Sequence, residues 1–317
     1  MTRPCTPSCV ANIRSTHGFF PIGSPTSPMK FRLLPTLLAL AFSVASLHAA
    51  DAPKPIKVLL ITGGCCHDYA KQKDILKAGL EKRGNIIVDQ IHSDDKSTKP
   101  PLSIYGNPDY AKGYDLVIHD ECSAGINEQA TVEAVLAPHR AGIPGVNLHC
   151  AMHSYRIGNP NEAVTELGTP HGLWFEYLGL QSSGHGPQEP IAISYTDKGH
   201  PITKGLADWT TIKEELYNNI KVFETARALA NGKQVAKIKK KNADGTETVT
   251  EKESDFVVAW TNTYMGKTRV FSTTIGHNND TVADDRFLDL VARGVLWATD
   301  KLGEDGQPKS GFGAGGK

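Results

Sequence analysis

Residues 143–153 read Ile143-Pro144-Gly145-Val146-Asn147-Leu148-His149-Cys150-Ala151-Met152-His153, and this stretch decides the fold. A short apolar run entered through a Pro-Gly pair predicts a buried strand. The strand ends abruptly at imidazoles and a thiol, and helix-compatible sequence follows. The motif Asn147-x-His149-x-Ala151 has the spacing of a nucleophile elbow, the sharp strand-to-helix turn that raises one side chain above a sheet. The raised residue here is His149, where a nucleophile would be Ser or Cys.

Strand and helix patterns alternate around this stretch. Strands are predicted at residues 57–62, 86–91 and 114–119, with helices at 68–83 and 127–141 between them. This interval is typical of an α/β fold with a doubly wound, mostly parallel sheet flanked by helices. The second half predicts strands at 191–195, 222–238, 256–260 and 269–275, a charged hairpin or loop at 239–253, and a final amphipathic helix at 284–299. We expect one domain over residues 57–301 and a flexible, glycine-rich tail over 302–317.

The N-terminus predicts export. A basic start at Met29, an apolar run and small residues before Ala49 and Ala50 form the three parts of a signal peptide over residues 29–50. Residues 1–28 lack periodicity and are interpreted as a mis-called extension, and residues 51–56 as a linker. The apolar run is too short for a membrane span, so we expect a secreted or periplasmic protein without stable membrane insertion after cleavage.

The net charge of the chain indicates which classes of binding partner are expected. Cleavage near Ala49 removes four basic residues and no acidic one from a chain that has 34 of each, which leaves a net charge near −4. A mildly acidic chain without a basic stripe is a poor candidate for nucleic-acid binding. Four of the six cysteines remain in the mature chain, in a compartment where disulfides persist.

Polar residues follow several predicted strands at the point where each ends. The stretch Gly63-Gly64-Cys65-Cys66-His67-Asp68 follows the first strand, Asp120-Glu121-Cys122 the third, and His149-Cys150 the elbow strand. Since parallel strands end at one edge of a sheet, we expect these groups to line one cleft. His277, after a late strand, is expected to join them.

Each group also has a structural interpretation. The Gly63-Gly64 pair is either a tight turn or a source of backbone N–H donors for an anion. Cys65 and Cys66 lack zinc-site spacing and are more typical of buried thiols, with a disulfide to Cys150 as the lesser alternative. His119 lies inside a strand and is interpreted as a core histidine.

Several histidines and a carboxylate are candidates for metal binding or catalysis. His149 and His153 have i,i+4 spacing and would share a helix face, with a carboxylate or His277 completing a site for a divalent metal such as zinc. Against this, the Glu of the His-Glu-x-x-His signature is absent. His185 is either a substrate contact or a surface residue. Glu214 and Glu215 are either a solvated pair or, beside Tyr217, include a half-buried acid with a raised pKa.

The chain resembles the ThuA-like (trehalose utilisation) family, whose fold is flavodoxin-like and similar to class I glutamine amidotransferases. The resemblance covers residues 57–300 and rests on Val58 to Asp68, Asn147 to Ala151, His185, His200 to Leu206, Glu214 to Tyr217, and Arg269 to His277. It implies that His149 stands where an amidotransferase has its nucleophilic cysteine, which argues against glutaminase chemistry. Cys150 follows one position late, and Glu214 stands where Asp is usual. The resemblance implies carbohydrate metabolism, linked to disaccharides and their 3-keto derivatives.

The leading hypothesis is an exported enzyme, of hydrolase, lyase or isomerase type, acting on a disaccharide or 3-keto-sugar. Its expected catalytic residues are His149, Glu215 and His277. Its expected substrate-binding residues are Gly63, Gly64, His67, Asp68, His153, His185 and Tyr217. The metal candidates are His149, His153 and His277, and a homo-oligomer is compatible with the sequence. The alternatives are a non-catalytic carbohydrate-binding protein on the same fold and a hydrolase that depends on Cys150.

Overall fold

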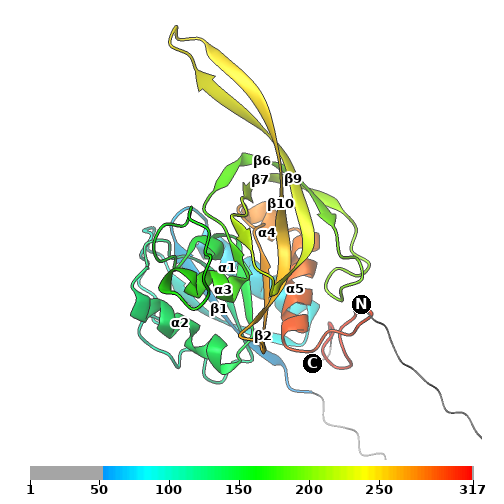
Figure 1. Cartoon of the computed structure of the whole chain (residues 1–317). Helices are drawn as coiled ribbons and strands as arrows, with labels where there is room; N and C mark the ends of the chain where they lie inside the picture. The colour runs from blue at the N-terminus through cyan, green and yellow to red at the C-terminus, as the bar shows by residue number, and fades with distance from the viewer. Residues whose placement is uncertain (1–52, 316–317) are drawn as a thin grey trace, which may run out of the picture. The chain divides into compact units, whose positions relative to one another are not determined.

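The computed structural model describes residues 53–315. Their main element is a nine-stranded sheet (Figure 1). The strand order is β2-β1-β3-β4-β11-β10-β9-β6-β7. In chain order these strands are β1 (Ile56–Gly64), β2 (Ile86–Ser93), β3 (Leu116–Cys122), β4 (Gly145–Leu148), β6 (His185–Tyr195), β7 (Trp209–Tyr217), β9 (Ala226–Lys241), β10 (Glu247–Tyr264) and β11 (Thr268–Thr273). The short strands β5 (Leu180–Gln181) and β8 (Lys221–Val222) pair separately.

The sheet is mixed. Strands β2, β1, β3, β4 and β11 are mutually parallel, whereas β10, β9, β6 and β7 continue the sheet by antiparallel pairing. The doubly wound α/β fold with flanking helices is therefore confirmed, and the antiparallel half accounts for the less regular pattern of the later sequence.

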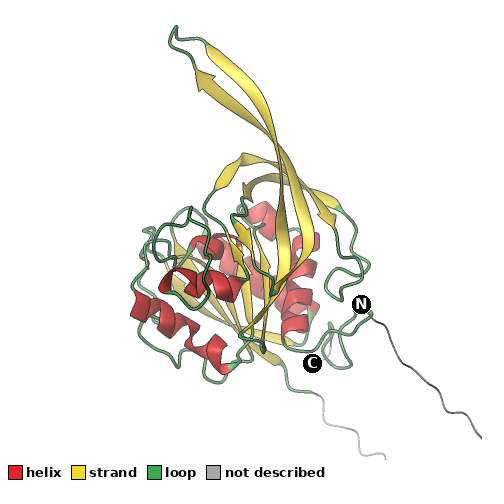
Figure 2. Cartoon of the chain, in the orientation of Figure 1, coloured by secondary structure: helices red, strands yellow, loops and turns green. Residues whose placement is uncertain are grey.

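Helices cover both faces of the parallel half (Figure 2). They are α1 (Tyr69–Arg83), α2 (Gln129–Ala141), α3 (Leu173–Leu178), α4 (Asn279–Val282) and α5 (Asp285–Ala298), with 3-10 helices η1 (His149–His153) and η2 (Pro170–Gly172). Alternate residues of β1 divide between two cores. Val58 and Leu60 pack with α1 and α5, whereas Leu59 and Ile61 pack with α2 and α3. This three-layer arrangement leaves the carboxyl ends of the strands uncovered by helices and available for a site.

A polar network lies inside the core beneath α2. His119 of β3 lies 2.8 Å from Glu121 through Nδ1 and 3.1 Å from His139 through Nε2. His139 Nδ1 donates to the carbonyl of Ile143, and the Tyr155 hydroxyl donates to Glu121. We call His119, Glu121, His139 and Tyr155 the buried network, since all four are fully buried. The interpretation of His119 as a core histidine agrees with this burial. Glu121, expected in the cleft, points into the core instead, because neighbouring side chains of a strand face opposite sides.

The antiparallel half carries a long two-stranded arm. Strands β9 and β10 pair from Ala226–Asn262 out to Lys241–Glu247, and the turn between them lies at the predicted Asp244-Gly245. β6 pairs with β9 only through Ala230–Lys233, so residues 237–253 form a ribbon that extends beyond the sheet (Figure 1).

The glycine-rich end departs from its prediction. Through residue 315 it packs against the domain, with Phe312 O accepting from the backbone N–H of Asn85 and Gly313 bridging to Gly84. The Lys301 ammonium lies over the Phe312 ring. Glycine composition alone suggested a frayed tail, but these backbone contacts to the start of β2 hold it. The predicted extension and signal peptide lie outside the described residues, and no helix within residues 53–315 is long and apolar enough to cross a membrane.

Candidate functional site

The turn after β1 carries His67 into the site. Gly63 and Gly64 have φ values of +134° and +102°, where L side chains are strained. A Cβ at Gly64 would lie 2.3 Å from the carbonyl oxygen of Cys122, and one at Gly63 would lie 2.6 Å from that of Ser93. The Gly64 N–H already donates to Asp95. Of the two interpretations of this pair, the contacts favour a close-packed turn, which directs His67 over the end of the sheet.

The elbow at His149 has the strained geometry that its sequence predicts. β4 ends at Leu148, and His149 follows at φ +42°. Its ring nitrogen Nδ1 donates to the carbonyl of Thr274 at 2.6 Å, which fixes the tautomer and leaves the Nε2 lone pair free for the site. The Tyr217 hydroxyl lies 3.4 Å from this Nε2. His149 is 1% exposed, so its orientation is set by the fold rather than by solvent.

His277 is held through its backbone. The carboxylate of Glu214 accepts from the N–H groups of Gly276, His277 and Asn278, at 3.4, 2.9 and 3.1 Å. From the other side, Gln72 of α1 donates to the carbonyl of His277 at 3.0 Å. Sequence reasoning missed Gln72, although a polar residue four positions before Leu76 on the inner face of a helix is a usable signal.

His67, His149 and His277 converge, and we call them the imidazole cluster. One ring nitrogen from each lies within 4.8 Å of the other two. The ring centroids are 4.6–5.4 Å apart, with the planes nearly perpendicular. Burial lowers the pKa of His67 to about 2, so this ring is neutral near pH 7.

Glu215 lies against the imidazole cluster. Its Oε2 is 3.2 Å from His277 Nδ1, and 3.5 Å from both His149 Nε2 and His185 Nε2. Burial alone would raise the pKa of Glu215, but contacts with His149 and His277 outweigh it and lower the pKa. The expectation of a raised pKa at this residue was therefore wrong, since it considered burial and not the imidazoles. Contact with Glu215 raises the pKa of His277, against the effect of burial.

His153 takes a different place from the one predicted. Residues 149–153 form a 3-10 helix, with three residues per turn, so i and i+4 positions do not share a face. His153 stacks on Tyr217 with ring centroids 4.3 Å apart, and its Nε2 lies 2.9 Å from the Ser182 hydroxyl. His67, rather than His153, thus joins His149 and His277 as the third imidazole.

The remaining predicted residues lie around the cluster. His185 is at the exposed rim and contacts Glu215, while Tyr217 is buried beneath it, with its ring stacked on that of His185. Asp68 is turned away and pairs with Lys71 and Asn279. Gln188, for which the sequence carries no signal, lies 2.8 Å from His277 Nε2 through its amide nitrogen.

The four cysteines among residues 53–315 are all free thiols. Cys150 is 7% exposed and packs with Tyr69 and Cys122. Its thiol therefore faces the core rather than the imidazole cluster, which is unfavourable for a nucleophile. Asp120 is buried as well, and burial raises the pKa of its carboxyl group.

The donor set of the imidazole cluster fits a divalent cation such as zinc. Zinc takes imidazole nitrogens and a carboxylate, and catalytic zinc sites often use three protein ligands. His149, through Thr274, carries the carbonyl-bonded second nitrogen that is typical of metal-ligating histidines, and the His67 ring lies 3.4 Å from the His277 carbonyl. Among the described residues, a second convergent group is made of Cys65, Cys66 and Cys122.

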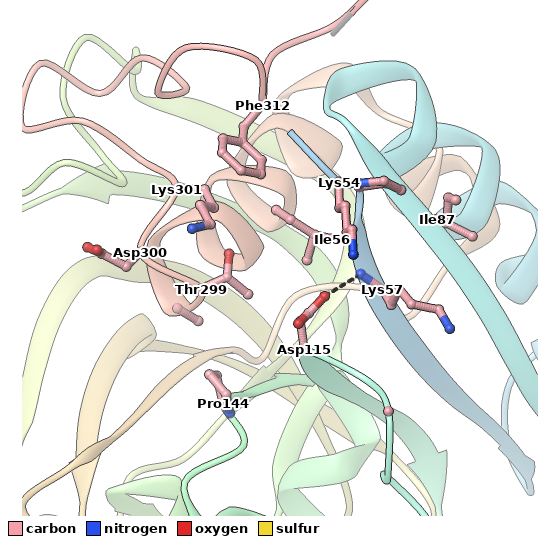
Figure 3. A pocket seen from close by; sticks show the side chains of 13 residues that line it. Lys54, Ile56, Lys57, Ile87, Asp115, Pro144, Thr299, Asp300, Lys301 and Phe312 are labelled. Atoms are coloured by element: carbon pink, nitrogen blue, oxygen red, sulfur yellow. Dashed lines mark hydrogen bonds between the residues drawn. The ribbon is translucent and has the colours of Figure 1, made fainter. Parts of the chain in front are cut away.

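A cavity of about 370 Å³ is lined by His185, which also contacts Glu215 of the site. Its lining further includes Asn218, Gln234 and Phe256. A larger cavity of about 810 Å³ lies where the parallel strands begin, at the opposite edge of the sheet (Figure 3). Its lining consists of lysine side chains, Asp115, Asp300 and apolar residues, and it lacks histidine and cysteine, so the chemistry is concentrated at the smaller cavity.

Comparison with known proteins gives a family match. The profile of the ThuA family, described as trehalose utilisation, matches residues 57–298. A ThuA-like protein from Parabacteroides merdae is 22% identical with a TM-score of 0.51, over 83% of this chain and 98% of that one. A ThuA-like protein from Bacteroides uniformis is 17% identical with a TM-score of 0.52, over 80% and 94%. At these identities the likeness shows the fold. A search of curated proteins found no match.

Proposed function

Since the chain belongs to the ThuA family, we propose that it is an exported enzyme that acts on a disaccharide or 3-keto-sugar by histidine and glutamate acid–base chemistry. Family membership gives a carbohydrate-related function. The substrate, the reaction and the export are our proposal. The observation that carries it is the convergence of His67, His149 and His277 around the carboxylate of Glu215.

The imidazole cluster supports a bound divalent cation such as zinc, held by His67, His149 and His277. Bound there, the cation would act as a Lewis acid that polarises a carbonyl or hydroxyl oxygen of the sugar. The protein's part is to hold the three ring nitrogens in fixed positions. Burial keeps His67 neutral, and the Thr274 carbonyl fixes the tautomer of His149.

Glu215 is the acid–base group of this proposal. Its lowered pKa keeps it ionised near pH 7, so it is ready to accept a proton from a sugar hydroxyl or from a carbon next to a keto group. A low pKa makes a carboxylate a weak base. The sugar proton must therefore be acidified, which is the case next to a carbonyl. This argument favours a keto-sugar over an unmodified disaccharide.

The cavity lined by His185 supports a sugar as the substrate. Its volume of about 370 Å³ is in the range of small-molecule sites. Phe256 offers an apolar face and Asn218 and Gln234 offer amides, a combination that suits a ring with hydrophobic C–H faces and hydroxyl edges. His185 would contact the part of the sugar nearest to Glu215.

The test compares sugar turnover by the protein with and without bound zinc. The purified protein, with zinc content measured by elemental analysis, is incubated with trehalose, sucrose and their 3-keto derivatives, and products are followed by NMR. We expect turnover of a keto-sugar that a chelator removes and zinc restores. His171→Ala is a matched control, because His171 packs on Phe175 and has no contact with the imidazole cluster.

Two outcomes would overturn the proposal. Calorimetric binding of these sugars without turnover, in zinc-loaded protein, would identify a carbohydrate-binding protein instead. Turnover that is lost on thiol alkylation but survives His149→Ala would identify a hydrolase dependent on Cys150. N-terminal sequencing of the protein recovered from its native compartment tests export, with a start after Ala49 or Ala50 expected.

A further inference from the structure

Three thiols converge beside the imidazole cluster. Cys65 and Cys66 lie in the turn after β1, and Cys122 is the last residue of β3, the strand next to β1. The sulfur of Cys65 is 3.3 Å from that of Cys122, and all three sulfurs lie within 4.8 Å of one another. Of the three histidines of the imidazole cluster, only His67 belongs to the same turn as Cys65 and Cys66.

The backbone is shaped to bring these thiols together. Gly64 is paired in register with Cys122, and its missing side chain lets the turn approach the Cys122 carbonyl. Cys66 has a φ of +82°, a left-handed conformation that is strained for a residue other than glycine. In extended chain the side chains of neighbouring residues point in opposite directions. The strained turn is therefore what allows Cys65 and Cys66 to share one centre.

We propose that Cys65, Cys66 and Cys122 form a three-thiolate site for a soft metal ion, with Cu(I) as the best match. Thiolates select Cu(I) and zinc among biological cations. A metal about 2.3 Å from three sulfurs in a plane would set them about 4 Å apart, which lies within the span of the three thiols. Structural zinc prefers a fourth ligand, whereas Cu(I) accepts three.

The neighbours of the site fit this assignment. Cys150 packs with Tyr69 and Cys122 and lies outside the group of three convergent thiols. Binding releases the protons of the three thiols. Cys66 is exposed, which gives the ion a route from solvent. The imidazole cluster, with harder ligands, is a separate centre.

The experiment is a Cu(I) titration of the full, reduced protein in competition with a Cu(I) chelator of known affinity. We expect one tightly bound Cu(I) per chain, with sulfur as the first-shell ligand by X-ray absorption. Cys66→Ser should weaken the affinity by at least about 100-fold, since even outer-shell changes at metal sites cost 10–100-fold. Because Cys66 is exposed, this variant should fold as the unmodified protein does. Cys122→Ser should have the same effect.

Cys150→Ser and His277→Ala are the matched controls and should keep the Cu(I) affinity within a few-fold. Failure of the reduced protein, with its four thiols titrated as free, to bind Cu(I) would overturn the proposal. A nitrogen first shell, or an affinity unchanged in Cys66→Ser, would overturn it as well. The proposal does not depend on turnover, so it can fail or succeed independently of the proposed function.

Discussion

The protein holds two groups of histidines that differ in how far their nitrogens are satisfied. In the buried network, every ring nitrogen of His119 and His139 has a partner, and the chain of contacts ends at the Ile143 carbonyl and the Tyr155 hydroxyl. In the imidazole cluster, rings converge with nitrogens that face one another and a carboxylate. A satisfied group stabilises a fold, whereas a convergent group with free lone pairs can bind or react.

The buried network and the imidazole cluster also differ in the contacts that hold their rings in position. The buried network lies among aromatic side chains, with His119 in edge contact with Trp174 and Tyr155. The imidazole cluster is positioned by backbone groups, namely the Thr274 carbonyl for His149 and the Glu214 carboxylate acting on the N–H groups around His277. Changes in the first group should therefore affect stability, and changes in the second should affect activity.

The largest expected effect is at His149. His149→Ala removes one of the three ring nitrogens that would hold the zinc. Since even changes to groups that only hydrogen-bond a metal ligand cost about 10–100-fold, keto-sugar turnover should fall by at least about 100-fold. The midpoint of thermal unfolding should change little, because the lost side chain belongs to the site and not to the hydrophobic core. Steady-state kinetics measure the turnover, and calorimetry measures the midpoint of unfolding. If His149→Ala mainly lowered the midpoint of unfolding and kept its turnover, the imidazole cluster would be a structural group like the buried network.

The reverse result is expected in the buried network. Glu121→Ala leaves His119 Nδ1 and the Tyr155 hydroxyl without their partner, at a cost of about 1–3 kcal/mol each. The free energy of unfolding, measured in urea, should fall by about 2–6 kcal/mol, while turnover per folded molecule is retained. An unchanged stability would show that water or a rearrangement satisfies these groups.

Glu214 tests how the cluster is positioned. Glu214→Gln replaces one acceptor oxygen by an N–H₂ group that faces the backbone donors of residues 276–278. We expect zinc affinity and turnover to fall by about 10–100-fold, as for other outer-shell changes at metal sites. Competition with a zinc chelator measures the zinc affinity, and steady-state kinetics measure the turnover. Equal values for the variant and the unmodified protein would remove Glu214 from the account.

These outcomes bear on what the sequence could predict. Strand ends and the elbow motif indicated His67, His149 and His277, because parallel strands end at one edge of a sheet. Glu215, inside the antiparallel strand β7, was proposed from its place beside Tyr217 and from the family resemblance. The choice between His153 and His67 was not accessible, because it depends on the 3-10 geometry after β4. The pKa of Glu215 was predicted in the wrong direction, since its neighbours come from three distant segments. Gln188 has no signal along the chain, because a single exposed amide looks like any other in the sequence.

The smallest effect is the pH dependence of stability. Burial, with the neighbouring His119, lowers the pKa of His139 to about 3, against about 6.5 in the unfolded chain. Between these values the unfolded state binds the extra proton, so His139 contributes full stability above about pH 6.5 and less as the pH falls. From pH 7 to pH 5 this contribution should drop by about 2 kcal/mol. His139→Gln should remove that part of the slope in urea unfolding. An equal slope in both proteins would contradict the low pKa.

The most direct test of the central claim is anomalous diffraction at the zinc edge from a crystal of the zinc-loaded protein. We expect a peak about 2.0–2.1 Å from one ring nitrogen each of His67, His149 and His277, with Glu215 beside it. No peak between these three rings, or zinc found only at the thiols of Cys65, Cys66 and Cys122, would contradict it.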